Sequence, residues 1–148
     1  MSQILSQSDW YEIRAADESA AIDLYGDIGA DWQAETLAAA GFVKAVAGIS
    51  AKTIDVRINS YGGSVYDGLA IYNALRSHGA KIRTFNEGIA ASIASLIYMA
   101  GDERVMAENA QLMIHAPWTI ALGNANELRD MADTLDRVSK SMASSYAS

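Results

Sequence analysis

The chain has 148 residues, of which 51% are hydrophobic and 20% charged, enough material for one globular domain with a buried core. The net charge is −7 and the basic residues do not cluster, which argues against nucleic acid as a partner. The chain has no cysteine, which excludes disulfides and thiolate metal sites. The first residues lack the charged and apolar regions of a signal peptide, and the apolar run over 89–100 is too short to span a bilayer. We therefore expect a cytoplasmic protein with no membrane partner.

Alternating apolar residues predict strands, and segments with one apolar face predict helices. From the start of the chain we expect an arm over residues 1–19, a strand over 20–25, a helix over 31–47 capped by Asp31, and a strand over 53–58 that ends in a turn at Gly62-Gly63. A helix that stops at Gly79, a strand over 81–85, a buried helix over 90–100, and strands over 104–106 and 111–115 follow. The last helix, over 124–146, carries an apolar stripe at steps of three and four residues: Leu128, Met131, Leu135, Val138 and Met142. Strands that alternate with helices predict an α/β fold with a parallel sheet.

A candidate nucleophile, Ser92, lies where a strand is expected to turn into a helix. Its neighbours Gly88, Ala90, Ala91 and Ala94 are small, so a substrate backbone could approach, and a helix start favours negative charge. The arrangement is similar to a nucleophile elbow, although the string differs from Gly-x-Ser-x-Gly. Taken alone, the segment suits close helix packing by small residues better than catalysis.

The Gly62-Gly63 turn could direct backbone N–H groups toward an oxyanion, because glycine adopts conformations closed to other residues. Seen in isolation, the pair equally suits an ordinary turn between a strand and a helix.

The sequence contains two histidines. His78 falls near a helix end, where we expect a structural capping role. His115 ends an apolar strand, at the kind of edge where open α/β sheets hold their active sites, and is the candidate general base. A buried, hydrogen-bonded structural histidine is the competing interpretation of His115. The spacing of the histidines predicts no metal site, and no cofactor is expected.

Four segments in order resemble the ClpP proteolytic subunit family: Ile58-Asn59-Ser60-Tyr61-Gly62-Gly63-Ser64, Gly68-Leu69-Ala70-Ile71-Tyr72, Gly88-Ile89-Ala90-Ala91-Ser92 and Met113-Ile114-His115-Ala116-Pro117. The resemblance runs from about Ile22 to the last helix. Tyr61 stands where the family usually has proline, which makes the chain look more like the ClpP-like head maturation proteases of phages and prophages.

The resemblance implies a ClpP/crotonase-like superhelix of repeated ββα units, with residues 118–148 forming a C-terminal handle that packs ring against ring. It implies that Ser92 is the nucleophile, that His115 is the general base, and that the N–H groups of Gly63 and Ile93 form the oxyanion hole. The family's third catalytic residue, an aspartate, is expected beyond residue 148, so the single domain over 1–148 looks truncated and nearly inactive by itself. Asp130 or Asp133 would be the first substitutes to consider within the chain.

The function implied by this resemblance is a serine endopeptidase that forms homo-oligomeric rings and acts on peptide or protein substrates. An AAA+ unfoldase or phage capsid proteins would be its partners. Two alternatives stay open: a crotonase-like acyl-CoA hydratase or isomerase, with Glu87 as the nearest candidate carboxylate, and a ring-forming relative without catalysis.

Overall fold

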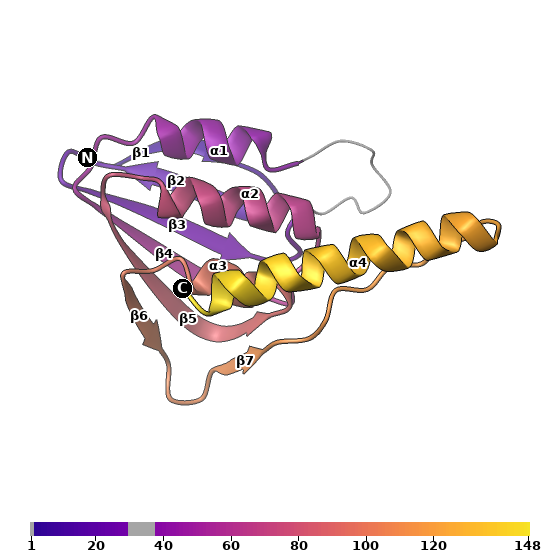
Figure 1. Ribbon diagram of the computed structural model, residues 1–148. Helices are drawn as coiled ribbons and strands as arrows, with labels where there is room; N and C mark the ends of the chain where they lie inside the picture. The colour runs from indigo at the N-terminus through magenta and orange to yellow at the C-terminus, as the bar shows by residue number, and fades with distance from the viewer. Residues whose placement is uncertain (1, 30–37) are drawn as a thin grey trace. The chain divides into compact units, whose positions relative to one another are not determined.

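The computed structural model describes residues 2–29 and 38–148, and the chain divides into two compact units, Met1–Ile114 and His115–Ser148 (Figure 1). The described part of the first unit holds a sheet in the order β1-β2-β3-β4-β5-β6, in which β7 also pairs with β5. The strands are β1 (Gln3–Gln7), β2 (Tyr11–Ala15), β3 (Ser19–Tyr25), β4 (Thr53–Ser60), β5 (Lys81–Ala91), β6 (Glu103–Met106) and β7 (Gln111–Met113). The first three strands pair antiparallel, and every pairing from β3 onward is parallel. The predicted α/β fold is confirmed.

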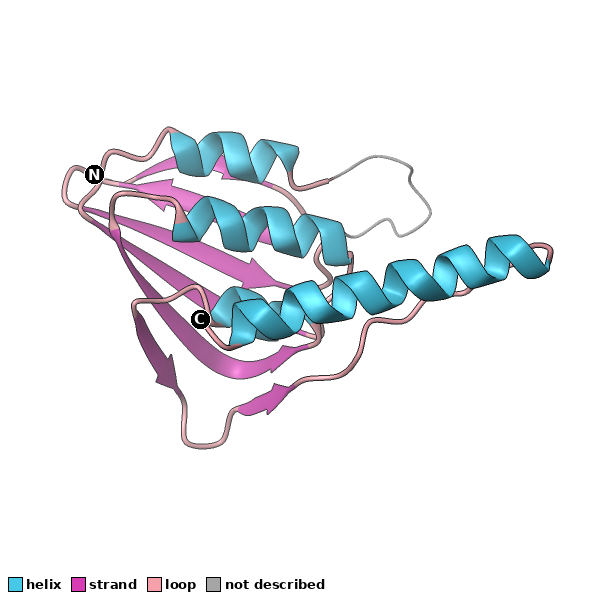
Figure 2. Ribbon diagram, viewed as in Figure 1, coloured by secondary structure: helices cyan, strands magenta, loops and turns pink. Residues whose placement is uncertain are grey.

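Three helices cover one face of this sheet: α1 (Ala40–Ala47), α2 (Val65–Arg76) and α3 (Ile93–Tyr98) (Figure 2). In β3, β4 and the first half of β5, every second residue points to that face and is buried, as Ile22, Val56 and Ile58 illustrate. The residues between them, among them Asp23 and Arg57, lie on the opposite face and are only partly buried. The period-two pattern therefore builds a core on one side of the sheet and a charged surface on the other.

Several boundaries differ from those expected, and the strand predicted over 111–115 ends at Met113, so His115 lies outside β7. Residues 3–15, expected as part of an irregular arm, contain β1 and β2. The strand expected over 81–85 continues to Ala91, and the helix expected from Ala90 begins at Ile93, because β7 pairs with residues 89–91 and keeps them extended. The predicted helix over 31–47 appears as α1 from Ala40, while Asp31 lies outside the described residues.

The second unit contains α4 (Ala125–Tyr146), which confirms the predicted amphipathic helix almost to the residue. Asn124 caps it: its Oδ1 accepts from the N–H of Asn126 at 2.9 Å and of Glu127 at 3.1 Å, while Glu127 Oε2 accepts from the Asn124 N–H at 2.7 Å. This reciprocal capping box satisfies three backbone donors at the helix start. Among the described residues, none of the helices is both long and apolar enough to cross a membrane.

Candidate active site

Ser92 lies at the junction of β5 and α3, where the backbone turns abruptly. Its φ is +54° and its ψ is −131°, and among the described residues it is the one non-glycine residue with a positive φ. Such a conformation costs on the order of 1–3 kcal/mol and persists only where the surrounding structure enforces it. Ser92 thus stands at the strand-to-helix turn that the sequence predicted.

Two hydrogen bonds fix the carbonyl of Ser92 from the helix side. The backbone N–H of Ser95 donates to it at 3.0 Å and the Ser95 hydroxyl donates at 2.5 Å. Ser95 is completely buried, so its side chain supports the turn from beneath. The two serines of the segment thus have separate places in the structure, and Ser95 is a structural residue.

The Gly62-Gly63 turn lies directly against Ser92. A Cβ on Gly62 would come within 2.6 Å of Ser92 Cβ and 3.2 Å of its Oγ, so this close approach requires glycine. The φ angles of Gly62 and Gly63 are +106° and +146°, which also favour glycine. Ser60 holds the turn, because its Oγ donates to Gly26 O at 2.6 Å and accepts from Gly62 N–H at 3.1 Å.

The amide of Gly63 is directed by an isolated parallel bridge to Ile28. Ile28 N–H donates to Gly62 O at 2.8 Å, and Ile28 O accepts from Ser64 N–H at 2.9 Å. In a parallel bridge the residue between the two bonded positions turns its own N–H away from the partner strand. The Gly63 N–H therefore faces away from Ile28 and is not used by that bridge. Ile93, the first residue of α3, carries an N–H that cannot find an acceptor within the helix.

The segment that leads to His115 runs beside Ser92. Ala90 pairs with Leu112 and Ala91 with Met113, and Ser92 N–H donates to Met113 O at 2.9 Å. His115 follows two residues after Met113 and is half-buried. The structure thus brings together Ser92, Gly62 and Ile93 within the first unit, whereas His115 begins the second unit and its role stays a prediction. Asp130 and Asp133 are exposed on α4.

His78 is engaged in the way expected of a structural residue. Its Nδ1 accepts from the N–H of Ala80 at 3.0 Å, and its Nε2 lies 3.2 Å from the carbonyl of Ile49. With Nδ1 as the acceptor, a proton on Nε2 completes the second hydrogen bond.

Two buried polar residues were missed by sequence reasoning. Asp67 is 3% exposed and accepts from the N–H of Ala39 at 2.7 Å, which ties α2 to the start of α1. Asn86 is 1% exposed and donates from Nδ2 to Gln111 O at 2.8 Å. For Asp67 the Ser64-x-x-Asp67 spacing was a usable capping signal, whereas for Asn86 the sequence carries none.

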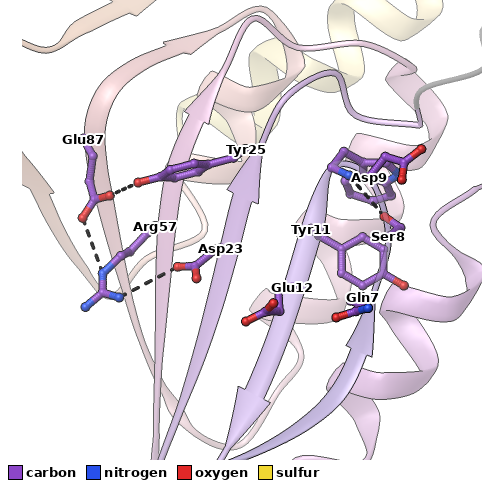
Figure 3. A pocket seen from close by; sticks show the side chains of 10 residues that line it. Gln7, Ser8, Asp9, Tyr11, Glu12, Asp23, Tyr25, Arg57 and Glu87 are labelled. Carbon is purple, nitrogen blue, oxygen red and sulfur yellow. Dashed lines mark hydrogen bonds and ion pairs between the residues drawn. The ribbon is translucent and has the colours of Figure 1, made fainter.

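A cavity of about 640 Å³ lies elsewhere on the first unit, lined by the sheet residues drawn in Figure 3. In it, the Tyr25 hydroxyl donates a hydrogen bond to Glu87. Arg57 forms two ion pairs, with Nε 3.4 Å from Glu87 Oε1 and Nη1 3.8 Å from Asp23 Oδ1. The hydrogen bond to Glu87, then burial, then the charge of Glu87 raise the pKa of Tyr25 to about 12. The Glu87 carboxylate thus contacts Tyr25 and Arg57. Ser92 is not among the residues that line this cavity. Within the described ranges, no cluster of three side chains suited to a metal ion occurs.

The chain is similar to proteins of one family over most of its length. The Clp protease family matches residues 6–148 of the chain. The chain is 37% identical over 98 residues to an ATP-dependent Clp protease proteolytic subunit of Pleurastrum terricola, a match that covers 65% of this chain and 50% of the relative. Proteins with the same description from Bacteroides fragilis and Ligilactobacillus salivarius are 36% and 39% identical over 93 residues, covering 62% of this chain and 45% and 47% of theirs. The aligned part thus spans about half the length of these curated relatives. Because the family match covers nearly all of its residues, the chain belongs to the Clp protease family.

Proposed function

We propose that the chain carries the catalytic core of a serine-type endopeptidase that acts on peptide or protein substrates through an acyl-Ser92 intermediate. The observation that carries this proposal is the positive φ of Ser92, enforced at a strand-to-helix junction with Gly62 in contact. A strained serine is not explained by packing alone, because glycine, which lacks a Cβ, would take the same backbone conformation at lower cost.

In the proposed reaction His115 accepts the Ser92 hydroxyl proton as Oγ attacks the carbonyl carbon of the scissile peptide. The N–H groups of Gly63 and Ile93 donate to the oxyanion that forms. When the C–N bond breaks, the leaving amine takes the proton from His115, and Ser92 is left as an ester. Water then attacks this ester, with His115 again accepting and returning a proton, which releases the acid and the free serine.

The family and the names of the relatives support the remaining parts of the proposal. The relatives are described as proteolytic subunits of an ATP-dependent protease, which favours an AAA+ unfoldase partner, a homo-oligomeric ring and a cytoplasmic location. Processing of phage capsid proteins rests only on Tyr61 in place of the family's proline, and we propose it as the narrower alternative.

A fluorophosphonate probe tests the nucleophile. The probe should add to Ser92 with loss of fluoride, which the intact mass and a peptide map would show. Ser92→Ala should abolish this addition and lower any peptidase turnover about 10⁴-fold or more. Ser95→Ala should cost far less. A wild-type chain that is not labelled at Ser92, or a Ser92→Ala chain that keeps full turnover, would contradict the proposal and reopen the non-catalytic and crotonase-like alternatives.

A further inference from the structure

The outer edge of β5 contains a gap in its pairing, just before the site. Residues 83–86 of β5 pair with β6, and residues 89–91 pair with β7. Between these two pairings the neighbouring chain leaves the sheet through residues 107–110, and Ala110 N–H donates to Ala107 O at 3.0 Å to close that turn. The position at which β7 returns to the sheet is therefore not fixed by continuous main-chain pairing.

Asn86 bridges this gap with both its backbone and its side chain. Its carbonyl accepts from Ala107 N–H at 3.0 Å, where the chain leaves the sheet. Its Nδ2 donates to Gln111 O at 2.8 Å, where the chain comes back as β7. One residue thus holds both ends of the turn.

The buried side chain of Asn86 lowers the free energy of unfolding compared with an apolar side chain of the same size. It is 1% exposed, and its Oδ1 is buried with no hydrogen-bond partner among the described residues. An unsatisfied buried polar atom costs on the order of 1–3 kcal/mol, and native proteins keep few of them. Gln111 itself is exposed, so water could replace the donor that Asn86 supplies to its carbonyl. Stability alone therefore does not account for asparagine here.

The hydrogen bond from Asn86 to Gln111 lies close to the site, because Met113, which contacts Ser92, is only two residues further along β7. Gln111 begins the strand and Met113 ends it, and Met113 O accepts the N–H of Ser92 at 2.9 Å. The same segment runs on to His115 two residues later. We propose that Asn86 is a positioning residue, which sets where β7 lies against Ser92 and thereby the reactivity of Ser92. This inference rests on the proposed function.

Reactivity should depend strongly on this placement. A displacement of about 1 Å, imposed by a change remote from the chemistry, can cost on the order of 100-fold in rate. Asn86→Leu keeps a similar volume, removes the unsatisfied oxygen and leaves Gln111 without its donor. We expect its unfolding midpoint in urea to match or exceed that of the wild type, while the maximal rate of Ser92 phosphonylation falls about 10- to 100-fold and the probe concentration at half-maximal rate stays unchanged.

Thr84→Val is the matched control. Thr84 is buried two residues earlier on the same face of β5, and its hydroxyl donates to Tyr98 O at 2.7 Å, at the far end of α3 from Ser92. Loss of this hydrogen bond should lower the free energy of unfolding by about 1 kcal/mol and leave the rate of Ser92 phosphonylation unchanged. Hydrogen exchange gives a second measurement, in which Asn86→Leu should accelerate the amides of Ser92 and of residues 111–114 and leave those of β6 unchanged.

Each outcome decides the inference. It is overturned if Asn86→Leu reacts with the probe as fast as the wild type, or if stability and rate fall together as they would for a structural residue. If the wild type is not labelled at Ser92, the proposed function fails, and hydrogen exchange then decides alone whether Asn86 sets the position of β7. Unchanged exchange at Ser92 and residues 111–114 would reject that placement.

Discussion

At Gly62 and Gly63, beside Ser92, an added side chain should strongly destabilise the fold and disturb the site. Gly62→Ala would bring a methyl group to 2.6 Å from Ser92 Cβ at a φ of +106°, and Gly63→Ala would drive one into the carbonyl of Ile28. We expect each to cost more than about 2 kcal/mol in free energy of unfolding and to suppress labelling of Ser92. Urea denaturation and probe labelling measure the two effects.

Gly79→Ala is the control for these variants, because, apart from the adjacent residues, no atom of the described chain lies within 4 Å of the position its Cβ would take. Its stability should stay within about 0.5 kcal/mol of the wild type. Wild-type stability and labelling in Gly62→Ala would mean that the turn does not lie against Ser92.

The phenol of Tyr25 gives a prediction on pH. Its pKa is raised to about 12, mainly by the hydrogen bond to Glu87 and then by burial and the nearby negative charge. The raised pKa means that the folded chain keeps the proton where the unfolded chain loses it. The stabilisation is therefore fully present below pH 10 and is lost as the pH rises through 12. It should be small, because Tyr25 is 45% exposed.

A Tyr25→Phe variant isolates this group. The difference between the ultraviolet pH titrations of wild type and variant should show a phenol that ionises near pH 12, and the variant's stability should fall less steeply between pH 10 and 12. A difference titration centred on pH 10 would show that the Tyr25–Glu87 bond does not form in solution.

At the site, the sequence could predict residues whose chemistry is visible in the chain itself. Ser92 and the glycine pair stand out because small residues crowd around strand ends. Asn86 could not be predicted as part of the site, because its significance depends on Gln111, 25 residues away, which only the fold brings near.

At the level of elements, β5 shows why the apolar run over 89–100 was divided in the wrong place. A short apolar run suits a buried strand and a buried helix equally well, and periodicity cannot separate them. The pairing of Ile89 with Gln111 keeps this part extended, and the helix begins only after the turn at Ser92. The strand β1 was missed for a different reason, because it carries few of the alternating apolar residues that mark a strand. In β2 the alternation is present, with Tyr11 and Ile13 buried, so that strand had a usable signal.

The long helix was predicted well because it supplies its own signals. Its stripe keeps a regular spacing from Leu128 to Met142, and Asn124 with Glu127 gives a capping box at its start. Asn124→Ala should remove two acceptor contacts and destabilise the first turn by about 1 kcal/mol. Faster hydrogen exchange at the start of α4, with β3–β5 unchanged, is the expected result.

Asn126→Ala is the matched control, since it keeps the Asn126 N–H that Asn124 caps and removes a side-chain oxygen that accepts an exposed hydrogen bond from Arg129 at 3.1 Å. Alanine is also the better helix former inside the first turn, so this variant should be neutral or slightly stabilising. Equal exchange in the two variants would show that the capping box contributes nothing in solution.

On the scale of the whole molecule, the second unit exposes several large apolar side chains. Trp118, Ile120 and Leu122 are 70%, 81% and 103% exposed, and the stripe of α4 adds Leu128 and Met131 at 44% and 38%. Contiguous exposed apolar surface is typical of a binding interface. A sustained 3–4 spacing further favours another helix as the partner.

We therefore expect the chain to associate with itself at micromolar concentration, with a mass by light scattering above the 15.8 kDa of a monomer. Replacing Leu128 and Met131 together by lysine puts two charges into the stripe and should reduce the measured mass. Asp130→Lys changes the charge of the same turn at an exposed position outside the stripe, and should leave association intact. A wild-type chain that stays monomeric would contradict the interface, and equal loss of association in both variants would assign it to net charge instead of the apolar stripe.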